Sequence, residues 1–400
     1  MSNGWIATLL FSVALIVTMG VFPFVLRFAR KHGLVDNPNA RKLQRVPVPV
    51  IGGAAVFWGV LVAMTLAITV FRFHFLAIGL VMMGIMWAIG TWDDMKDIPP
   101  MFRFCVETVL IWGMMVISET GLNDLHGLWG FGEMSMYFWL PLSIVAGVGI
   151  INAINLIDGV DGYCSGFCMV AFVLYGTVLF KVGNIPTACF CMICAGALIP
   201  FFLHNVFGQK SKMFLGDGGS LMMGTGLVCV LFRMLSNGSY CSALEEDGVG
   251  LMALTLAVMC IPVFDTLRVM SMRVLRGLSP FHPDKTHLHH LFIEMGFSHV
   301  GTSISIILIN LFVVAVWYLS YRLGASIDWQ FYIVVMMGVL VTFGFYRFMK
   351  VQQVYNDGEG TKLYQWFRRR GAKTHIEHDG FWLWMRHLVD VVLNVKDSKE

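Results

Sequence analysis

Long apolar runs constrain this chain more than any other feature of the sequence. A helix of about 20 apolar residues crosses the roughly 30 Å hydrocarbon core of a bilayer. We identify eleven such runs, at 5–28, 51–71, 75–92, 103–120, 137–154, 163–181, 187–204, 218–236, 249–269, 301–323 and 329–347. The sequence therefore predicts an all-α, polytopic membrane protein with about eleven transmembrane helices.

The composition agrees with this fold class. Charged residues make up only 13% of the 400 residues, whereas soluble domains carry about 25%. The first run is too long for the apolar core of a signal peptide, so we expect it to remain as a helix. The nine cysteines lie mostly inside apolar runs, which favours a packing role over a disulfide or metal site.

The distribution of lysine and arginine predicts the orientation in the membrane. With the N-terminus outside, the inside segments and the tail together hold 24 of the 28 lysine and arginine residues. Such residues gather in cytoplasmic segments. We therefore predict a periplasmic N-terminus and a cytoplasmic C-terminus. The inside segments are 27–50, 93–103, 155–162, 205–217, 268–300 and the tail from residue 347.

We expect two parts, a transmembrane catalytic domain over 1–347 and a cytoplasmic basic tail over 348–400. The tail is either a soluble helical extension or an amphipathic helix in the membrane interface, and aromatics at 381–385 near the arginines at 368–370 favour the second reading. It contains no motif with chemistry, so we expect its removal to leave the reaction intact. No internal repeat is evident, which disfavours an inverted-repeat transporter.

Acidic residues are rare in the apolar part of the chain and gather at helix ends on the side assigned as cytoplasmic. Ionisable residues at membrane depth are costly, so they are functional candidates. Caps and loop turns alone would scatter over both faces. Four segments carry these residues: 93–97 with Asp93, Asp94 and Asp97; 152–162 with Asn152, Asn155, Asp158 and Asp161; 214–220 with Phe214 and Asp217; and 265–290 with Asp265, His287, His289 and His290.

These residue types indicate metal-assisted phosphoryl transfer at a membrane surface. Several carboxylates without thiolates suit Mg²⁺, which commonly bridges one or two carboxylates to substrate phosphates. The glycines around Asp217 let backbone N–H groups approach phosphate oxygens, and a helix beginning there favours anions. The histidines are contacts to phosphate or sugar or, less in keeping with so many carboxylates, zinc ligands. Cationic residues suited to a diphosphate are Arg41, Lys42, Arg45, Arg103 and Lys285.

These blocks resemble those of the polyprenyl-phosphate N-acetylhexosamine-1-phosphate transferases, the MraY/WecA-like family (glycosyltransferase family 4). The resemblance covers about 1–345 and runs in order through 36–53, 93–97, 152–162, 214–220 and 265–290. It implies that a lipid phosphate attacks the β-phosphate of a UDP-sugar, which releases UMP and leaves a lipid-diphosphate-sugar. It also implies Mg²⁺ as cofactor, with Mn²⁺ as a substitute.

The same resemblance implies a role for each block. Asp217 would hold Mg²⁺, and Asp93 and Asp94 would activate or orient the lipid phosphate. Asp158 and Asp161 would bind the nucleotide and complete the catalytic set. Direct attack and an aspartyl-phosphate intermediate both stay open, as does a merely interhelical pairing of the asparagines. The expected substrate-binding residues are Lys42, Arg45, Asn152, Asn155, Phe214 (stacked on uracil), His287, His289 and His290.

Two sequence forms point to the WecA-type branch of the family. The segment 49–53 reads Pro-Val-Ile-Gly-Gly where cell-wall members carry Pro-Thr-Met-Gly-Gly, and Leu288 interrupts the histidines. We therefore expect a bacterial inner-membrane enzyme, active on the cytoplasmic face, that transfers N-acetylglucosamine 1-phosphate from UDP-GlcNAc to undecaprenyl phosphate and initiates envelope polysaccharide synthesis. Another UDP-N-acetylhexosamine is the alternative donor. We expect a homodimer and no nucleic-acid partner.

Other functions fit the sequence less well. A CDP-alcohol phosphotransferase needs Asp-Gly followed by an Ala-Arg pair and two further spaced aspartates, which we do not find. A prenyltransferase would account for 93–97 but not for 214–220 or the histidines. A lipid-linked-sugar flippase or transporter would need charges near the bilayer midplane, whereas these acids stand at helix ends. Two residues depart from the family pattern. Gln44 stands where many relatives have a histidine, which leaves the role of that position open, and Arg103 stands for a lysine, which keeps the charge although a guanidinium is not equivalent to an ammonium.

Overall fold

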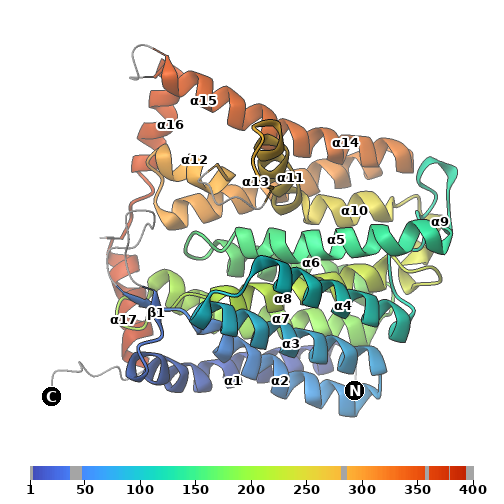
Figure 1. The fold of residues 1–400 in the computed structure, drawn as a ribbon, viewed down its shortest axis with the longest axis horizontal. Helices are drawn as coiled ribbons and strands as arrows, with labels where there is room; N and C mark the ends of the chain where they lie inside the picture. The colour runs from blue at the N-terminus through green and yellow to red at the C-terminus, as the bar shows by residue number, and fades with distance from the viewer. Residues whose placement is uncertain (1–2, 37–46, 281–285, 356–359, 378, 393–400) are drawn as a thin grey trace. The chain divides into compact units, whose positions relative to one another are not determined.

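The computed structural model describes residues 3–36, 47–280, 286–355, 360–377 and 379–392. Regular structure in these residues is almost entirely helical, in line with the predicted class (Figure 1). A short antiparallel ribbon joins β1 (Val35–Asp36) to β2 (Val48–Pro49). The chain divides into two compact units: unit 1 comprises Met1–Asn123, Ser135–Cys241 and Asp379–Glu400, and unit 2 comprises Asp124–Met134 and Ser242–His378.

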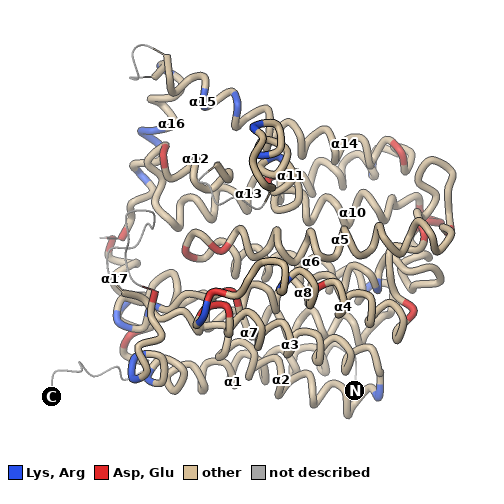
Figure 2. The backbone as a smooth tube through the Cα atoms, in the orientation of Figure 1, with Lys and Arg blue, Asp and Glu red and all other residues tan. Residues whose placement is uncertain are grey.

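Unit 1 is a bundle of long helices. Uncharged stretches run along them and charged residues lie mainly toward their ends (Figure 2). α8 is enclosed by its neighbours, chiefly α3 and α5, and almost all of its residues are buried. The helices of unit 1 are α1 (Asn3–Lys31), α2 (Gly52–Phe71), α3 (His74–Lys96), α4 (Pro100–Ser118), α5 (Met136–Leu156), α6 (Tyr163–Lys181), α7 (Ile185–Phe207), α8 (Gly216–Met234) and α17 (Gly380–Val392).

Among the described residues, nine helices are long and apolar enough to span a membrane, and up to ten if a bent pair counts as one span. The chain is therefore a multi-pass membrane protein. α8 is not one of the nine because five glycines, Asp217 and Arg233 lower its hydropathy. Its neighbours shield it from lipid, so an apolar surface is not required of it. The count of eleven and the orientation of the termini stay predictions.

Unit 2 contains the bent pair, α10 and α11, which meet at 75°. Pro262 explains the break, because a proline has no N–H to donate to the carbonyl four residues earlier, that of Val258. Asn310 of α13 fills this gap: its Nδ2 donates to Val258 O and its Oδ1 accepts from Ile261 N, both at 2.9 Å.

The elements of unit 2 are η1 (Leu128–Gly130), α9 (Ala243–Glu246), α10 (Leu251–Val258), α11 (Cys260–Leu275), α12 (Leu288–Glu294), α13 (His299–Arg322), α14 (Ile327–Val339), the π-helix η3 (Leu340–Phe345), α15 (Tyr346–Val354) and α16 (Lys362–Ala372). The short helix η2 (Tyr240–Ser242) lies where the two units join in sequence.

The tail contributes a helix to each unit. α16 belongs to unit 2, where Thr374, just after it, bonds to Ser298 at the start of α13. α17 belongs to unit 1, where it packs on α7. The predicted boundary after residue 347 and the interfacial location of the tail stay predictions.

Candidate active site

The ends of three helices of unit 1 bring the predicted aspartates together. α3 carries Asp93 and Asp94 in its last turn, and the turn after α5 carries Asp158 and Asp161. α8 has Asp217 in its first turn. α3 reaches α8 closely because residue 90 is glycine: a Cβ there would lie 2.5 Å from the backbone of Asp217.

The guanidinium of Arg103, in the first turn of α4, links these acids. Its Nη1 donates to Asp93 Oδ2 at 2.9 Å and to Asp217 Oδ2 at 3.2 Å. Its Nη2 donates to Asn152 Oδ1 at 3.3 Å, and its Nε lies 3.7 Å from Glu107 Oε1. One cation thus contacts three carboxylates and by itself balances only part of their negative charge.

Asp94 closes the N-terminus of α8. Its Oδ1 accepts from the N–H of Asp217 at 3.0 Å and its Oδ2 from that of Gly218 at 3.1 Å. The first N–H groups of a helix have no partner inside it, and the helix dipole favours an anion there. Gly216 has a φ of 74°, and a Cβ on it would lie 2.5 Å from Asp94 Oδ2, so this turn requires glycine. The anion position that the sequence suggests for a phosphate is therefore taken by a carboxylate.

The two predicted asparagines fix side chains of the cluster from α5. Asn155 Nδ2 donates to Asp217 Oδ1 at 2.8 Å and to Ser220 Oγ at 2.9 Å. Asn152 Nδ2 donates to the fully buried Glu107 at 2.5 Å. Both asparagines thus make interhelical bonds, and both bonds orient groups that surround Asp217.

The turn after α5 adds two more carboxylates. Burial, together with the negative charges of Asp217, Asp94 and Asp161, raises the pKa of Asp158 well above its usual value. Asp161 Oδ2 accepts from Lys212 Nζ at 2.6 Å. We refer to Asp93, Asp94, Asp158, Asp161 and Asp217 as the acid cluster. Among the described residues, Arg103 and Lys212 are basic contacts of this cluster.

Phe214 belongs to the loop 208–215, termed the α7–α8 loop. Its N–H donates to Pro49 O at 2.8 Å, and its carbonyl accepts from Gly52 N at 2.9 Å, so the loop is fixed to β2 and to the start of α2. The Phe214 ring is half-buried, and Lys212 Nζ lies 6.0 Å from its centroid. The predicted binding residues Lys42 and Arg45 lie outside the described residues, in the segment between β1 and β2, and so do Arg41, Gln44 and Lys285.

The predicted histidines form a separate cluster in unit 2. Asp265 of α11 is buried and accepts from Arg268 Nη2 at 2.7 Å, from His287 Nδ1 at 2.9 Å and from Leu288 N at 3.1 Å. The His287 and His289 rings are parallel, with centroids 5.7 Å apart.

The three histidines lie close enough to affect one another. The rings of His289 and His290 have centroids 4.3 Å apart. Burial and the neighbouring His290 and His287 lower the pKa of His289 well below its usual value. His289 is therefore neutral at physiological pH, which suits hydrogen bonding rather than charge pairing with a substrate.

The acid cluster has the donor chemistry of a magnesium site without a preformed cage. No group of three or more His, Cys, Asp or Glu side chains within the described ranges is arranged to hold a metal ion. Mg²⁺ needs only one or two protein carboxylates when substrate phosphates and water complete its shell. Asp217 is the more open of two candidate ligands, with 37% of its side chain exposed against 13% for Asp93.

Lys212 and Ser220 are site neighbours that the sequence analysis missed. Ser220 stands three residues after Asp217 in a block already singled out, so helical spacing could have identified it. Lys212 belongs to no motif, and its partner Asp161 is far away in sequence. Only the packing of the α7–α8 loop brings these two side chains together.

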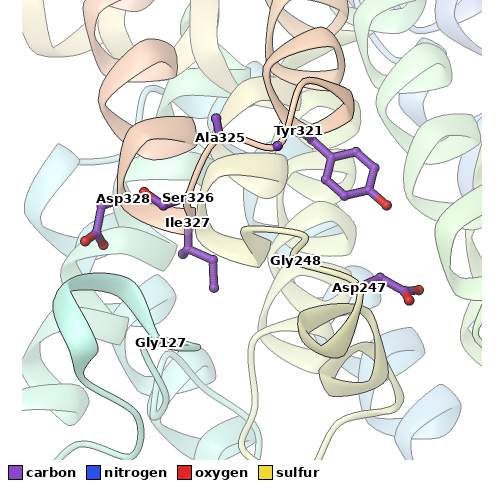
Figure 3. Close-up of a pocket in the computed structure, with 9 residues that line it drawn as sticks. Gly127, Asp247, Gly248, Tyr321, Ala325, Ser326, Ile327 and Asp328 are labelled. Carbon is purple, nitrogen blue, oxygen red and sulfur yellow. The ribbon is translucent and has the colours of Figure 1, made fainter.

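A surface pocket in unit 2 is lined by none of the predicted site residues that the structure describes. It has a volume of about 480 Å³ and is lined by loop residues including Tyr321, Ile327 and Asp328 (Figure 3). The carboxylates of Asp247 and Asp328 point away from each other, and Asp328 accepts from the N–H of Trp129 at 2.7 Å. The pocket therefore presents no converging set of polar groups.

Comparison with known proteins places these features in a family context. The family model described as glycosyl transferase family 4 matches residues 75–235. An undecaprenyl-phosphate alpha-N-acetylglucosaminyl 1-phosphate transferase of Escherichia coli K12 is 30% identical over 296 residues, which cover 73% of this chain and 78% of the relative. A protein of the same name from Yersinia pestis is 32% identical, covering 74% and 78%. A probable undecaprenyl-phosphate N-acetylglucosaminyl 1-phosphate transferase of Bacillus subtilis is 29% identical, covering 75% and 81%.

Proposed function

The chain belongs to glycosyl transferase family 4, and on this premise we propose that it transfers N-acetylglucosamine 1-phosphate from UDP-N-acetylglucosamine to undecaprenyl phosphate. The products are undecaprenyl-diphospho-N-acetylglucosamine and UMP. The names of the relatives support a phosphosugar transferase with this lipid acceptor. The product would initiate an envelope polysaccharide.

The acid cluster of unit 1 is the observation that carries this proposal. The reaction brings a lipid phosphate against a nucleotide diphosphate, and both substrates are anions. A site rich in carboxylates would repel them unless a cation joined the two sets of charges. Among the described residues, the acid cluster has more carboxylates than the two basic contacts Arg103 and Lys212, and this supports a site completed by a divalent cation.

We assign Mg²⁺ to Asp217, with Mn²⁺ as a substitute. When bound, the ion would neutralise the diphosphate and the charge that develops on the leaving UMP. Arg103 and Asn155 hold the Asp217 carboxylate from two sides, at 3.2 Å and 2.8 Å. Asp94, through the backbone N–H of Asp217, fixes the turn from which this side chain projects.

The remaining roles follow from position and protonation. Asp93, bonded to Arg103, is proposed to orient the attacking lipid phosphate, together with Asp94. Asp158 and Asp161 are proposed to bind the nucleotide, with Phe214 as the stacking surface for uracil. The raised pKa of Asp158 would let its carboxyl take up a proton in the site.

The histidine cluster is proposed to contact the diphosphate or sugar of the donor. Asp265 fixes His287 through Nδ1, so Nε2 is the ring nitrogen that remains for another partner. Within the part of the chain that the structure describes, this buried Nε2 has no hydrogen-bond partner. A buried ring nitrogen without a partner is costly, so we assign a substrate oxygen as its partner.

Location and orientation are part of the same proposal. We place the enzyme in a bacterial inner membrane, with the N-terminus periplasmic and the site on the cytoplasmic face. The lysine and arginine distribution supports this orientation. The charged groups of the acid cluster lie at helix ends and beside them rather than at mid-helix, as expected for a site at the membrane surface.

The test is UMP release by the purified enzyme with undecaprenyl phosphate and a panel of UDP-sugars. We expect the highest kcat/KM with UDP-N-acetylglucosamine. A preference of more than about tenfold for another UDP-N-acetylhexosamine, which corresponds to ~1.4 kcal/mol, would change the donor and keep the reaction. Movement of labelled lipid-linked sugar across the membrane without UMP release would instead indicate a flippase.

A further inference from the structure

The last helix of the tail inserts a carboxylate into the α7–α8 loop. Asp390 of α17 accepts from the N–H groups of Gln209 and Lys210 at 3.3 Å and from that of Ser211 at 3.0 Å. It also accepts from Ser211 Oγ at 2.7 Å. Consecutive backbone N–H groups that converge in this way form an anion-binding nest. The nest is filled by a residue about 180 positions further along the chain.

Apolar contacts hold α17 in this position. The Trp382 ring is only 5% exposed and has its centroid 4.5 Å from that of Phe207, at the end of α7. Val389 is also buried. Trp382, Val389 and Asp390 share one face of the helix, because positions seven or eight apart are close to two full turns. The carboxylate is therefore delivered by a docked helix rather than by a loose end of the chain.

The loop is held from other sides as well. Ser211 is fully buried, and its Oγ also bonds to His204 Nδ1 at 3.0 Å. Arg30 of α1 donates to the carbonyl of Lys210. Asp390 is nevertheless the group that collects the N–H donors of 209–211 on one acceptor. Without it, these three donors would lose that acceptor together.

Residues of the proposed donor site follow directly in the same loop. Lys212, next to Ser211, reaches Asp161, and Phe214 is bonded through its backbone to β2 and α2. α8 begins immediately afterwards, with Asp217 in its first turn. A shift of the loop at 209–211 would therefore displace Lys212 and Phe214 first, and Asp217 less, because Asp94 and Asn155 also hold Asp217.

We propose that Asp390 is a positioning residue that fixes the α7–α8 loop for binding of the UDP-sugar donor. This inference rests on the proposed function. It assigns the tail a part in the reaction, which no sequence motif in 348–400 indicates. Asp390 does not touch the reacting groups. It acts through Gln209, Lys210 and Ser211 on the side chains that follow them.

The test compares Asp390→Asn with Asp379→Asn in the full chain. Asparagine is nearly isosteric with aspartate, but it loses the charge and one acceptor oxygen. Asp379 is an exposed aspartate of the same tail, so the same substitution there is the matched control. Trp382→Ala is a second variant, which loosens α17 without changing Asp390.

Two readouts separate positioning from a general loss of structure. We expect Asp390→Asn to raise the KM for UDP-N-acetylglucosamine about tenfold, with kcat and the KM for undecaprenyl phosphate changed by less than about threefold. Hydrogen exchange at the amides of 209–211 should become faster in the same variant. Trp382→Ala should change both readouts in the same direction, and Asp379→Asn should change neither.

Three results would overturn the inference. The first is an unchanged KM for UDP-N-acetylglucosamine in Asp390→Asn. Even if hydrogen exchange at 209–211 became faster, the contact of Asp390 with the loop would then have only a structural role. Another is an equal loss of active enzyme in Asp390→Asn and Trp382→Ala with unchanged KM values. The third is absence of UMP release from the wild type with every UDP-sugar, which would remove the proposed function and the donor role with it; faster exchange in Asp390→Asn would still show the anchor.

Discussion

The acid cluster of unit 1 and the buried Asp265 of unit 2 differ in how far the charges of their aspartates are satisfied. Asp265 in unit 2 accepts bonds from Arg268, His287 and the N–H of Leu288, and the guanidinium of Arg268 also stacks on Tyr346 at 3.8 Å. This carboxylate has a cation and further donors on both of its oxygens. The charge of Asp265 is therefore satisfied without any ligand.

Asp217 in unit 1 is in the opposite situation. It shares one guanidinium nitrogen of Arg103 with Asp93, and Asp94 and Asp158 are further carboxylates nearby. More than a third of its side chain is exposed. In the part of the chain that the structure describes, these carboxylates outnumber the cations that contact them. Like charges held together cost stability, and such sites are characteristic of function. This contrast supports the proposal that Asp217 binds a cation together with anionic substrates, whereas Asp265 maintains structure.

Neutralising Asp217 should give the largest effect on turnover. Asp217→Asn removes the proposed Mg²⁺ ligand, and we expect kcat to fall by about a thousandfold, or ~4 kcal/mol in the barrier. The thermal midpoint should stay the same or rise, because a repelling charge is lost. UMP release and thermal unfolding in detergent check both parts. A variant that retains near wild-type kcat would mean that Asp217 does not hold the metal.

Neutralising Asp265 should affect the stability of the fold more than the turnover of the folded enzyme. Asp265→Asn leaves Arg268 and His287 without their shared carboxylate, and breaking a buried pair of this kind costs about 3 kcal/mol. We expect a lower thermal midpoint and less folded enzyme. The kcat per folded molecule should fall far less than in Asp217→Asn. An unchanged midpoint with abolished turnover would place Asp265 among the catalytic groups and break the comparison.

A smaller, pH-dependent effect should distinguish the acid cluster further. Because the pKa of Asp158 is raised in the folded protein, the fold loses stability as pH rises above the unfolded value of about 3.9. Asp158→Asn should therefore raise the thermal midpoint, and by more at pH 7 than at pH 5. Unfolding curves at the two pH values in EDTA measure this, with Asp379→Asn as the exposed control. An equal shift at both pH values would show that the charge of Asp158 is not the cause.

The sequence was most informative about ionisable residues, because such residues are costly in an apolar chain. Acids such as Asp93, Asp94 and Asp217 stand out there, and the structure brings them together with Asp158 and Asp161. The break at Val258 has a local cause as well, since Pro262 withdraws one N–H. The helix count was less certain, because α8 is shielded by protein and carries glycines instead of a lipid-facing surface.

Contacts between distant segments could not be predicted in the same way. Lys212 has no local signal that pairs it with Asp161, and Asp390 lies in a tail without motifs. For this reason the sequence led us to expect an intact reaction after removal of the tail. The bonds from 209–211 to Asp390 lead instead to the expectation of weaker donor binding.

The central claim is that the acid cluster is an active centre completed by a divalent cation. The most direct test of this claim is whether turnover depends on a metal ion. The measurement is UMP release by the purified wild-type enzyme from UDP-N-acetylglucosamine and undecaprenyl phosphate, first in EDTA and then after addition of Mg²⁺ or Mn²⁺. We expect turnover to disappear in EDTA and to return with either ion, because in the proposed site one or two carboxylates and the substrate phosphates together bind the ion. Full turnover in EDTA would contradict this account of the acid cluster.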